Sequence, residues 1–387
     1  MASIAQVAGA RTRARQAAAS DPYMFILVGV LALFGLVTIW SAGGAQPITL
    51  GSPVTRQAFY LIVGIGVMAV LASMNYRFLK SLAVPIYAVS IALLLVVPFV
   101  GTTINGATRW LVVGPISFQP SDFAKLAVVL ALAAFLSERH DEMDRFFNFI
   151  ISGLIVFLPF GLVFIEPDLG TSFVFVVIWF LMLAVSKTRI LYLIGTVLLA
   201  IPAAFFSWRF LLQDYQRDRL LVSYDPQRDY FGAGFNIVQA HVTIGTGGWF
   251  GNGLTGGIQS EYQFLRVRDT DFIFAHAMSM FGFFGGLALM LCFVLLFHRM
   301  IRTVGVARDT FGQYVATGVT AMLVFQTFIN IGMNLGLMPV TGLPLPFISL
   351  GGTALVTNLA AIGVLQSILI NRRALAFEPG SPGLRRI

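Results

Sequence analysis

The segment FLRVRDTDFIF, residues 264–274, decides how this chain folds, because it marks an abrupt change from polar to apolar sequence. A polar stretch runs from residue 208 to Thr270, and the sequence after Asp271 stays apolar for long enough to cross a lipid bilayer. Asp271 therefore lies where water meets hydrocarbon. Because ionisable groups at membrane depth are costly, this carboxylate is predicted to be a functional residue.

The composition is that of a membrane protein with several spans. Of the 387 residues, 57% are hydrophobic and 11% are charged, and the mean hydropathy is +0.85. Soluble domains have about 25% charged residues, and one core could not bury so much apolar surface. The single cysteine, Cys292, excludes a disulfide framework and a thiolate metal cluster, and the four scattered histidines give no zinc signature.

Ten apolar runs are long enough to be membrane-spanning helices, which need about 20 residues each. The fold class predicted is therefore an all-α polytopic membrane protein with about ten transmembrane helices. A secretory signal is the alternative for the first run, but that run is longer than the roughly 7–15 residues of a signal core. The predicted spans are 24–42, 57–74, 79–99, 121–138, 146–165, 169–186, 189–208, 272–297, 313–336 and 348–370.

The net charge of +8 reports topology and does not indicate a nucleic-acid partner. Cytoplasmic loops carry an excess of Lys and Arg, and placing both termini inside leaves only Arg56 and Arg109 in the short outer loops. The prediction is a cytoplasmic tail over 1–20, a membrane domain over 21–370 and a cytoplasmic tail over 371–387. A large extracytoplasmic loop, 209–271, then joins the seventh and eighth spans.

One polar block precedes the fourth span, at residues 106–125 (GATRWLVVGPISFQPSDFAK). Ser121 is a candidate N-cap of that span. Asp122 and Lys125 are spaced i,i+3, which favours a local ion pair with the lysine reaching toward the headgroups. The alternative is that Lys125 and Arg109 hold a lipid phosphate.

A second block, EPDLGT at 166–171, lies between the fifth and sixth spans. Asp168 at the start of an apolar helix is most simply a cap residue, because the helix dipole favours a carboxylate there. A metal or substrate role is the alternative.

The remaining blocks lie in and after the long loop. The segment DYQRDR at 214–219 is predicted to be helical, and an Asp-Pro turn follows it. The glycine-rich segment 245–257 lacks the Gly-Lys-Ser/Thr of a phosphate loop, so close packing or re-entry at the membrane surface is predicted. The prolines within 336–352 require a structured break between the ninth and tenth spans, either a rigid turn or the lining of a cavity.

These blocks, in this order, resemble the SEDS family, whose best-known members are RodA and FtsW, and the RodA-like members are favoured. The matching segments cover roughly residues 24–370, and the TDFIF block at 270–274 and the TGLPLPFISLGG block at 341–352 are the most specific. The resemblance implies a peptidoglycan glycosyltransferase in the cytoplasmic (inner) membrane of a bacterium. Such an enzyme polymerises lipid II into glycan strands at the outer membrane face, for cell elongation or division, and works with a class B penicillin-binding protein.

The resemblance also implies roles for particular residues. Asp271 matches the family's essential aspartate and is predicted to be the catalytic base, since a positioned carboxylate can activate a weak sugar hydroxyl. The leaving pyrophosphate requires cations or a divalent metal ion, Mg or Mn. The predicted substrate-binding residues are Arg109, Gln119, Lys125, Asp168, Arg217, Arg219, Thr270 and Ser349.

The chain departs from the family pattern around Asp271. The usual acidic residues are replaced at Val267 and at Ser279-Met280, while His276 lies nearby. A hard divalent cation prefers carboxylate ligands, so a reduced dependence on metal is predicted, with Arg266 and Arg268 supplying part of the charge. Two other classes stay open: a lipid II flippase or transporter, and a weakly catalytic membrane scaffold for a transpeptidase. The transporter class is disfavoured because the ionisable residues gather at the outer mouth rather than at the membrane midplane.

Overall fold

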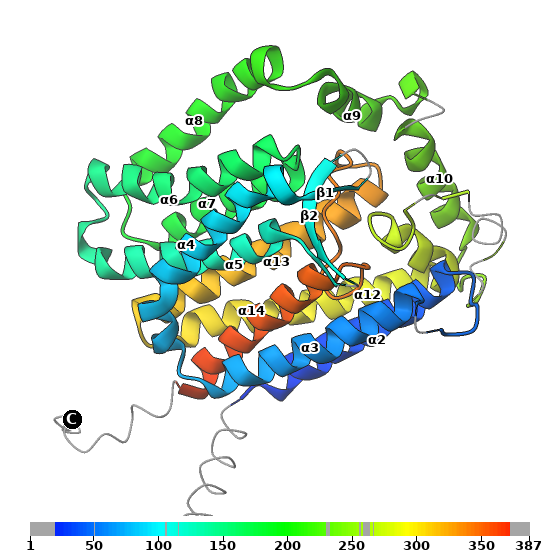
Figure 1. Ribbon diagram of the computed structural model, residues 1–387, viewed down its shortest axis with the longest axis horizontal. Helices are drawn as coiled ribbons and strands as arrows, with labels where there is room; N and C mark the ends of the chain where they lie inside the picture. Colours follow the sequence, from blue (N-terminus) through cyan, green and yellow to red (C-terminus); the bar gives the residue numbers. More distant parts are fainter. Residues whose placement is uncertain are drawn as a thin grey trace, which may run out of the picture.

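The structure is a computed structural model that describes residues 20–49, 51–104, 107–114, 116–229, 233–254, 257, 264–265 and 267–371. It is mostly helical, as predicted, and Figure 1 shows the helices gathered into one bundle. The main helices are α2 (Pro22–Ala42), α3 (Pro53–Ser73), α4 (Tyr76–Val100), α5 (Pro120–Glu138), α6 (Phe146–Ile165), α7 (Leu169–Val185), α8 (Ile190–Phe206), α9 (Asp214–Tyr224), α10 (Ala233–Thr246), α12 (Ile273–Val306), α13 (Thr310–Asn334) and α14 (Gly352–Asn371).

Each of the ten predicted spans corresponds to a helix. Within the described residues, nine helices are long and apolar enough to cross a membrane, and α7 is a shorter apolar helix of 17 residues. The chain is a multi-pass integral membrane protein. The predicted terminal tails fall largely on residues 1–19 and 372–387, which lie outside the described residues.

Three predicted span boundaries were wrong by four residues or more. Helix α3 begins at Pro53 rather than at residue 57. Helix α12 continues to Val306 rather than ending at residue 297, so the basic residues Arg299 and Arg302 lie on the helix and not in a loop. Helix α14 begins at Gly352 rather than at residue 348, because the proline-rich segment before it is not helical and Phe347 has a φ of +68°.

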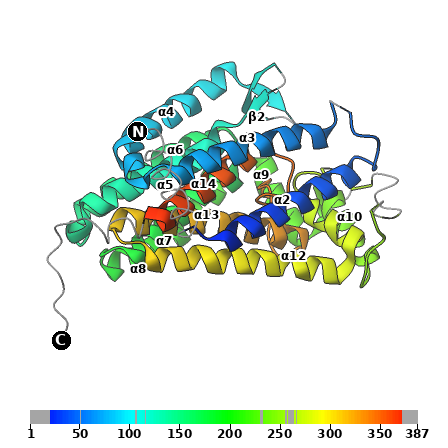
Figure 2. The same cartoon turned by 90° about the horizontal axis from the view of Figure 1, so that it is seen from below.

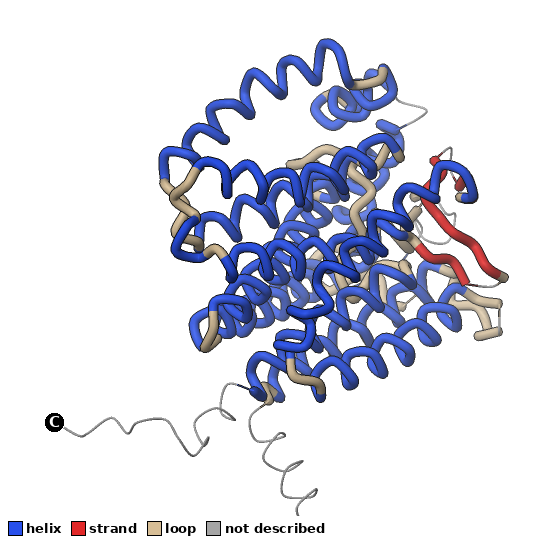
Figure 3. The backbone as a smooth tube through the Cα atoms, turned by 60° about the vertical axis from the view of Figure 1, so that its left-hand side comes forward, coloured by secondary structure: helices blue, strands red, loops and turns tan. Residues whose placement is uncertain are grey.

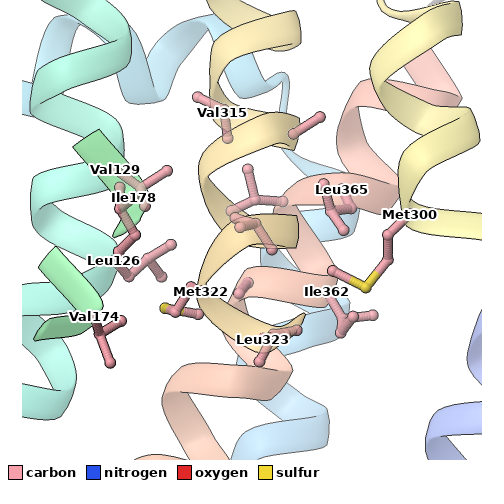
Figure 4. Packing of buried hydrophobic residues seen from close by; sticks show 14 of the residues in the cluster. Leu126, Val129, Val174, Ile178, Met300, Val315, Met322, Leu323, Ile362 and Leu365 are labelled. Carbon is pink, nitrogen blue, oxygen red and sulfur yellow. The ribbon is translucent and has the colours of Figure 1, made fainter. Parts of the chain in front are cut away.

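Three helices form the interior of the bundle, and α8 is the most exposed of the candidate spans in the described part of the chain. The most hydrophobic stretches of α5, α13 and α14 are 83%, 78% and 89% buried, whereas that of α8 is only 6% buried. Figure 4 shows α13 at the centre, with Val174 and Ile178 of α7 on one side and Ile362 and Leu365 of α14 on the other. Figure 1 shows α8 leaving this core and leading to α9, and Figure 2 shows the long α12 along one edge of the bundle.

A small sheet at one end of the bundle was not predicted. Strands β1 (Thr102–Ile104), β2 (Ala107–Val113) and β3 (Ile116–Phe118) form an antiparallel sheet in the order β1-β2-β3. Figure 3 shows these strands at the end of the bundle away from the described chain ends. We call this end the outer end, because the distribution of cations predicts that it faces outward.

The glycine-rich segment packs against a kink in α12, which confirms the predicted close packing. Gly282 interrupts the helix with a φ of +66° and a ψ of −166°. Four main-chain hydrogen bonds of 2.9–3.2 Å join residues 248–253 to residues 279–284. A Cβ on Gly251 would lie 2.1 Å from the carbonyl oxygen of Met280, so only glycine permits this approach.

Other local predictions had mixed outcomes. The segment 214–219 is helical within α9, as predicted, and a 3₁₀ turn over Pro226–Asp229 follows it. The cap prediction for Ser121 was wrong. Helix α5 begins one residue earlier, at Pro120, with Gln119 at the N-cap position. The Ser121 hydroxyl is buried and has no hydrogen-bond partner among the described residues.

Candidate active site

Asp271 ends the long loop, two residues before α12 begins. Its main-chain carbonyl accepts hydrogen bonds from Nδ2 of Asn330 at 3.2 Å and of Asn334 at 3.0 Å. The two asparagines lie one turn apart on α13, and Oδ1 of Asn334 also accepts a hydrogen bond from the amide of Ala275 at 3.0 Å. Helix α13 therefore fixes the start of α12 and with it the position of Asp271.

The proline-rich segment before α14 holds the residues that precede Asp271. The Ser349 hydroxyl donates to the carbonyl of Thr270 at 2.7 Å and accepts from the amide of Leu345 at 2.9 Å. The amide of Leu350 donates to the carbonyl of Asp269 at 2.8 Å. Ser349 was predicted to bind substrate. In the structure its hydroxyl proton is used in a hydrogen bond that positions the main chain at Thr270.

The same segment also borders the Asp271 carboxylate. A Cβ placed on Gly342 would lie 4.0 Å from Oδ2 of Asp271, and a Cβ on Gly170 would lie 2.7 Å from the carbonyl oxygen of Thr341. The proline-rich segment therefore runs between Asp271 and the start of α7. Packing against both elements holds this segment in place, as expected of a structured break.

Asp168 caps α7, as predicted, and binds further residues of the outer end. Its Oδ1 accepts from the amide of Thr171 at 3.1 Å, and its Oδ2 accepts from the Thr171 hydroxyl at 3.0 Å. Nε2 of Gln119 donates to the same Oδ2 at 3.3 Å, and Nη1 of Arg109 lies 3.7 Å from it. Two separate sequence blocks, 106–125 and 166–171, therefore meet at this carboxylate.

Strand β2 places Arg109 over the connection between α6 and α7. The guanidinium donates through Nε to the carbonyl of Glu166 at 2.8 Å and through Nη2 to the carbonyl of Pro167. These bonds fix the side chain, which lies only partly exposed at the outer end. A planar guanidinium with five donors keeps further N–H groups for an anion.

Charged groups from three further elements act on the Asp271 carboxylate. Burial is the largest cause that raises its pKa, to about 6. Arg219 on α9 and Arg109 on β2 lower the pKa, whereas Asp168 and Asp269 raise it. In the described part of the chain, the carboxylate itself accepts no hydrogen bond, so it is free to receive a proton.

Two of the four predicted substrate-binding cations, Lys125 and Arg217, pair with a carboxylate three residues earlier on the same helix. Nζ of Lys125 donates to Oδ1 of Asp122 at 2.8 Å, and both side chains are buried, so the predicted ion pair is present. Arg217 lies 3.3 Å from Oδ1 of Asp214 and from the carbonyl of Arg209. The structure brings Arg109 and Arg219 within electrostatic range of Asp271 and pairs Lys125 and Arg217 with neighbouring carboxylates.

An apolar cavity of about 520 Å³ lies between α3, α4, α5 and α14. Its walls include Val67, Ile86 and Leu130, and its polar lining includes Ser117 and Thr353. The Thr353 hydroxyl accepts from the amide of Gln119 at 3.1 Å and donates to the carbonyl of Ser117 at 3.2 Å. Hydrogen bonds of Gln119 therefore join Thr353, at the cavity, to Asp168 at the outer end.

The described side chains do not form a metal site. Within that part of the chain, no three Asp, Glu, His or Cys side chains gather closely enough to hold a metal ion. Nε2 of His276 lies 3.1 Å from the hydroxyl of Ser41 on α2. Arg266, one of the cations expected to replace part of a metal's charge, lies outside the described residues.

Sequence reasoning missed three residues of this region. Asn330 and Asn334 are amides four residues apart in an apolar span, a signal that indicates an inward-facing polar stripe. Glu166, the first residue of the 166–171 block, is the third, and it is only 3% exposed. The sequence gives no signal for the burial of Glu166, because that burial depends on which elements pack around the end of α6.

The apolar helices and the charged residues around Asp271 define the class of protein. It is a polytopic membrane protein with a polar site at the outer end of its helical bundle. A family model described as "Cell cycle protein", FTSW_RODA_SPOVE, matches residues 22–374, and the chain belongs to this family.

The chain is similar to named members of this family. It is 37% identical over 364 residues to peptidoglycan glycosyltransferase MrdB of Escherichia coli (strain K12), covering 92% of this chain and 95% of the relative. It is 35% identical over 355 residues to stage V sporulation protein E of Bacillus subtilis (strain 168), covering 90% and 96%.

Solved structures agree with these similarities. A chain from a study titled "Structural coordination of polymerization and crosslinking by a peptidoglycan synthase complex" matches with a TM-score of 0.79 at 32% identity, over 91% of this chain and 98% of that one. The crystal structure of the rod shape determining protein RodA of Thermus thermophilus matches with a TM-score of 0.68 at 29% identity, over 91% and 97%.

Proposed function

We propose that this protein is a peptidoglycan glycosyltransferase that polymerises lipid II at the outer face of the cytoplasmic membrane. The observation that carries the proposal is the Asp271 carboxylate, which is held through its main chain by α13 and surrounded by Arg109, Arg219 and Asp168. The relatives named as peptidoglycan glycosyltransferases support the same reaction class.

Asp271 acts as the general base in this proposal. The hydroxyl of the acceptor sugar attacks the anomeric carbon of the lipid-linked sugar, and its proton passes to the carboxylate. The bond between that carbon and the diphosphate oxygen breaks, and the diphosphate leaves with the electron pair. A base with a pKa of about 6 is largely ionised at neutral pH and still basic enough to accept the proton, so positioned proton transfer contributes about 10²–10⁴-fold.

Arg109 and Arg219 stabilise the charge that develops on the leaving diphosphate. Both cations act on the Asp271 carboxylate from different elements, so a diphosphate beside Asp271 would lie within their reach. Preorganised cations at a developing anion are among the largest contributions to catalysis. Gln119, Asp168, Thr270 and Ser349 support this arrangement through the hydrogen bonds described above.

The apolar cavity between α3, α4, α5 and α14 suits the prenyl tail of such a substrate. Its walls are nearly all hydrocarbon, and its polar residues Ser117 and Thr353 connect through Gln119 with Asp168. A tail in this cavity would place its diphosphate near the Asp168 group. The proposed partner is a class B penicillin-binding protein, in keeping with the synthase complex that one structural relative forms part of.

The test is polymerisation of lipid II by the purified full chain, with and without its candidate transpeptidase. Asp271→Ala should abolish glycan polymer while the protein stays folded and binds its partner. Asp218→Ala is the matched control, because Asp218 is an exposed carboxylate on α9 that does not act on Asp271. Near-normal turnover by Asp271→Ala would refute the assignment, and no polymer from the unsubstituted chain under any condition would favour a scaffold.

A further inference from the structure

Glu166 contrasts with Asp168 in the surroundings of its carboxyl group. It follows the last residue of α6, its side chain is 3% exposed, and neither carboxylate oxygen has a hydrogen-bond partner among the described residues. Asp168, two residues away, is equally buried but accepts hydrogen bonds from Thr171 and Gln119 on its two oxygens. A buried ionised carboxylate without such partners would be very costly.

The charges around Glu166 favour its neutral form. Arg109 on β2 and Asp168 at the N-terminus of α7 are the charged groups that act on it. Arg109 donates to the main-chain carbonyl of Glu166, not to its carboxylate, and lies 3.7 Å from Asp168. Burial and the charge of Asp168 together raise the pKa of Glu166 to about 8, although Arg109 opposes them.

The protonation of Glu166 decides the net charge that a substrate anion meets. With Glu166 neutral, the group of Arg109, Asp168 and Glu166 has no net charge, and the remaining N–H donors of Arg109 can bind an anion. With Glu166 ionised, the group carries one negative charge and repels the anion. Charges in a partly buried site are weakly screened, so this difference of one charge reaches the bound anion.

We propose that Glu166 is a protonated positioning residue that keeps Arg109 available for the diphosphate of a prenyl-linked substrate. The inference rests on the proposed function and deepens it, since it adds a second titrating group to the same site. Glu166 has no contact with the reacting atoms in this account. It acts through Arg109, and ionisation of its carboxyl group weakens diphosphate binding.

The first experiment measures binding of lipid II to the full chain in lipid nanodiscs, with Asp271→Ala present to prevent turnover. The diphosphate of lipid II is a diester, so its own charge stays constant over the range tested. We expect the affinity to fall about tenfold between about pH 7 and about pH 9.5, the change that corresponds to one pKa unit of differential interaction. Glu166→Gln and Glu166→Met, both permanently neutral, should abolish most of this fall.

The matched control is Glu142→Gln, which removes an exposed carboxylate paired with Arg145 at the opposite end of the bundle. Its ratio of affinities at the two pH values should equal that of the parent. An equal fall with pH in the parent and in both neutral variants would overturn the inference. An affinity independent of pH in the parent would overturn it as well.

A second experiment tests protonation without any substrate. The infrared band of a protonated carboxyl group is followed with pH in the parent chain and in Glu166→Gln. We expect a band that disappears above about pH 8 in the parent and is missing from the variant. A variant spectrum identical to the parent at neutral pH would overturn the inference. This result is independent of glycan polymerisation, so failure of the proposed function would show separately, as turnover by Asp271→Ala.

Discussion

The kink of α12 at Gly282 should be required for the active-site geometry, and Gly282→Ala tests this. The residue has a φ of +66° and a ψ of −166°, a conformation that side-chain-bearing residues rarely adopt. A Cβ there would lie 2.4 Å from the amide nitrogen of Gly251 and 2.6 Å from that of Phe250. These are main-chain atoms, so the two segments must separate to admit a methyl group.

The loss of folding stability in Gly282→Ala can be worked out from the backbone strain and from the hydrogen bonds that the separation breaks. The strained backbone conformation costs about 1–3 kcal/mol. Four main-chain hydrogen bonds join residues 248–253 to residues 279–284, and each contributes about 0.5–1.5 kcal/mol. Losing two of the four with the strain gives about 2–6 kcal/mol. Because the first half of α12 starts beside Asp271, polymerisation should fall together with stability.

The assay is thermal unfolding in detergent together with lipid II polymerisation. Gly305→Ala, in the same helix, is the matched control, because nothing lies within 4 Å of the Cβ that it adds. That control should be neutral or stabilising by up to about 1 kcal/mol. If Gly282→Ala unfolds at the parent's temperature and polymerises at the parent's rate, the reasoning about the kink is wrong.

The other predictions concern charges. Polymerisation should fall on acidification through about pH 6, because Asp271 has a raised pKa and protonation removes the base; a rate that is flat between about pH 5 and 7 would contradict this. Lys125→Met should destabilise the protein by about 3–5 kcal/mol, because it leaves Asp122 buried and unpaired, and adding Asp122→Asn should restore most of that stability in the same unfolding assay. Arg109→Ala should weaken lipid II binding by about 1.5–3 kcal/mol, as measured by titration, whereas unchanged affinity would assign Arg109 to the sheet connection alone. Polymerisation should need less divalent metal than in a typical family member, because Arg266 and Arg268 supply part of the charge; strict loss under a chelator that magnesium or manganese restores would reject this prediction.

The sequence alone determined the class of fold and the place of Asp271. A membrane satisfies no backbone hydrogen bonds, so long apolar runs must be helices, and their order along the chain can be counted directly. The same argument placed Asp271 at the junction of loop and span. Local spacing was also sufficient for the Asp168 cap and the ion pair of Asp122 with Lys125, because both depend on residues within one helical turn.

Only the tertiary structure decided which distant residues meet. The binding of the Asp271 carbonyl by Asn330 and Asn334 depends on how α12 packs against α13, some 60 residues away. Packing between separate elements also decides that the glycine-rich segment binds the kink at Gly282. It likewise decides that Arg109 donates a hydrogen bond to the carbonyl of Glu166. Burial and the charges of neighbours set whether a carboxyl group is ionised, and both are properties of the packed bundle rather than of the residue order.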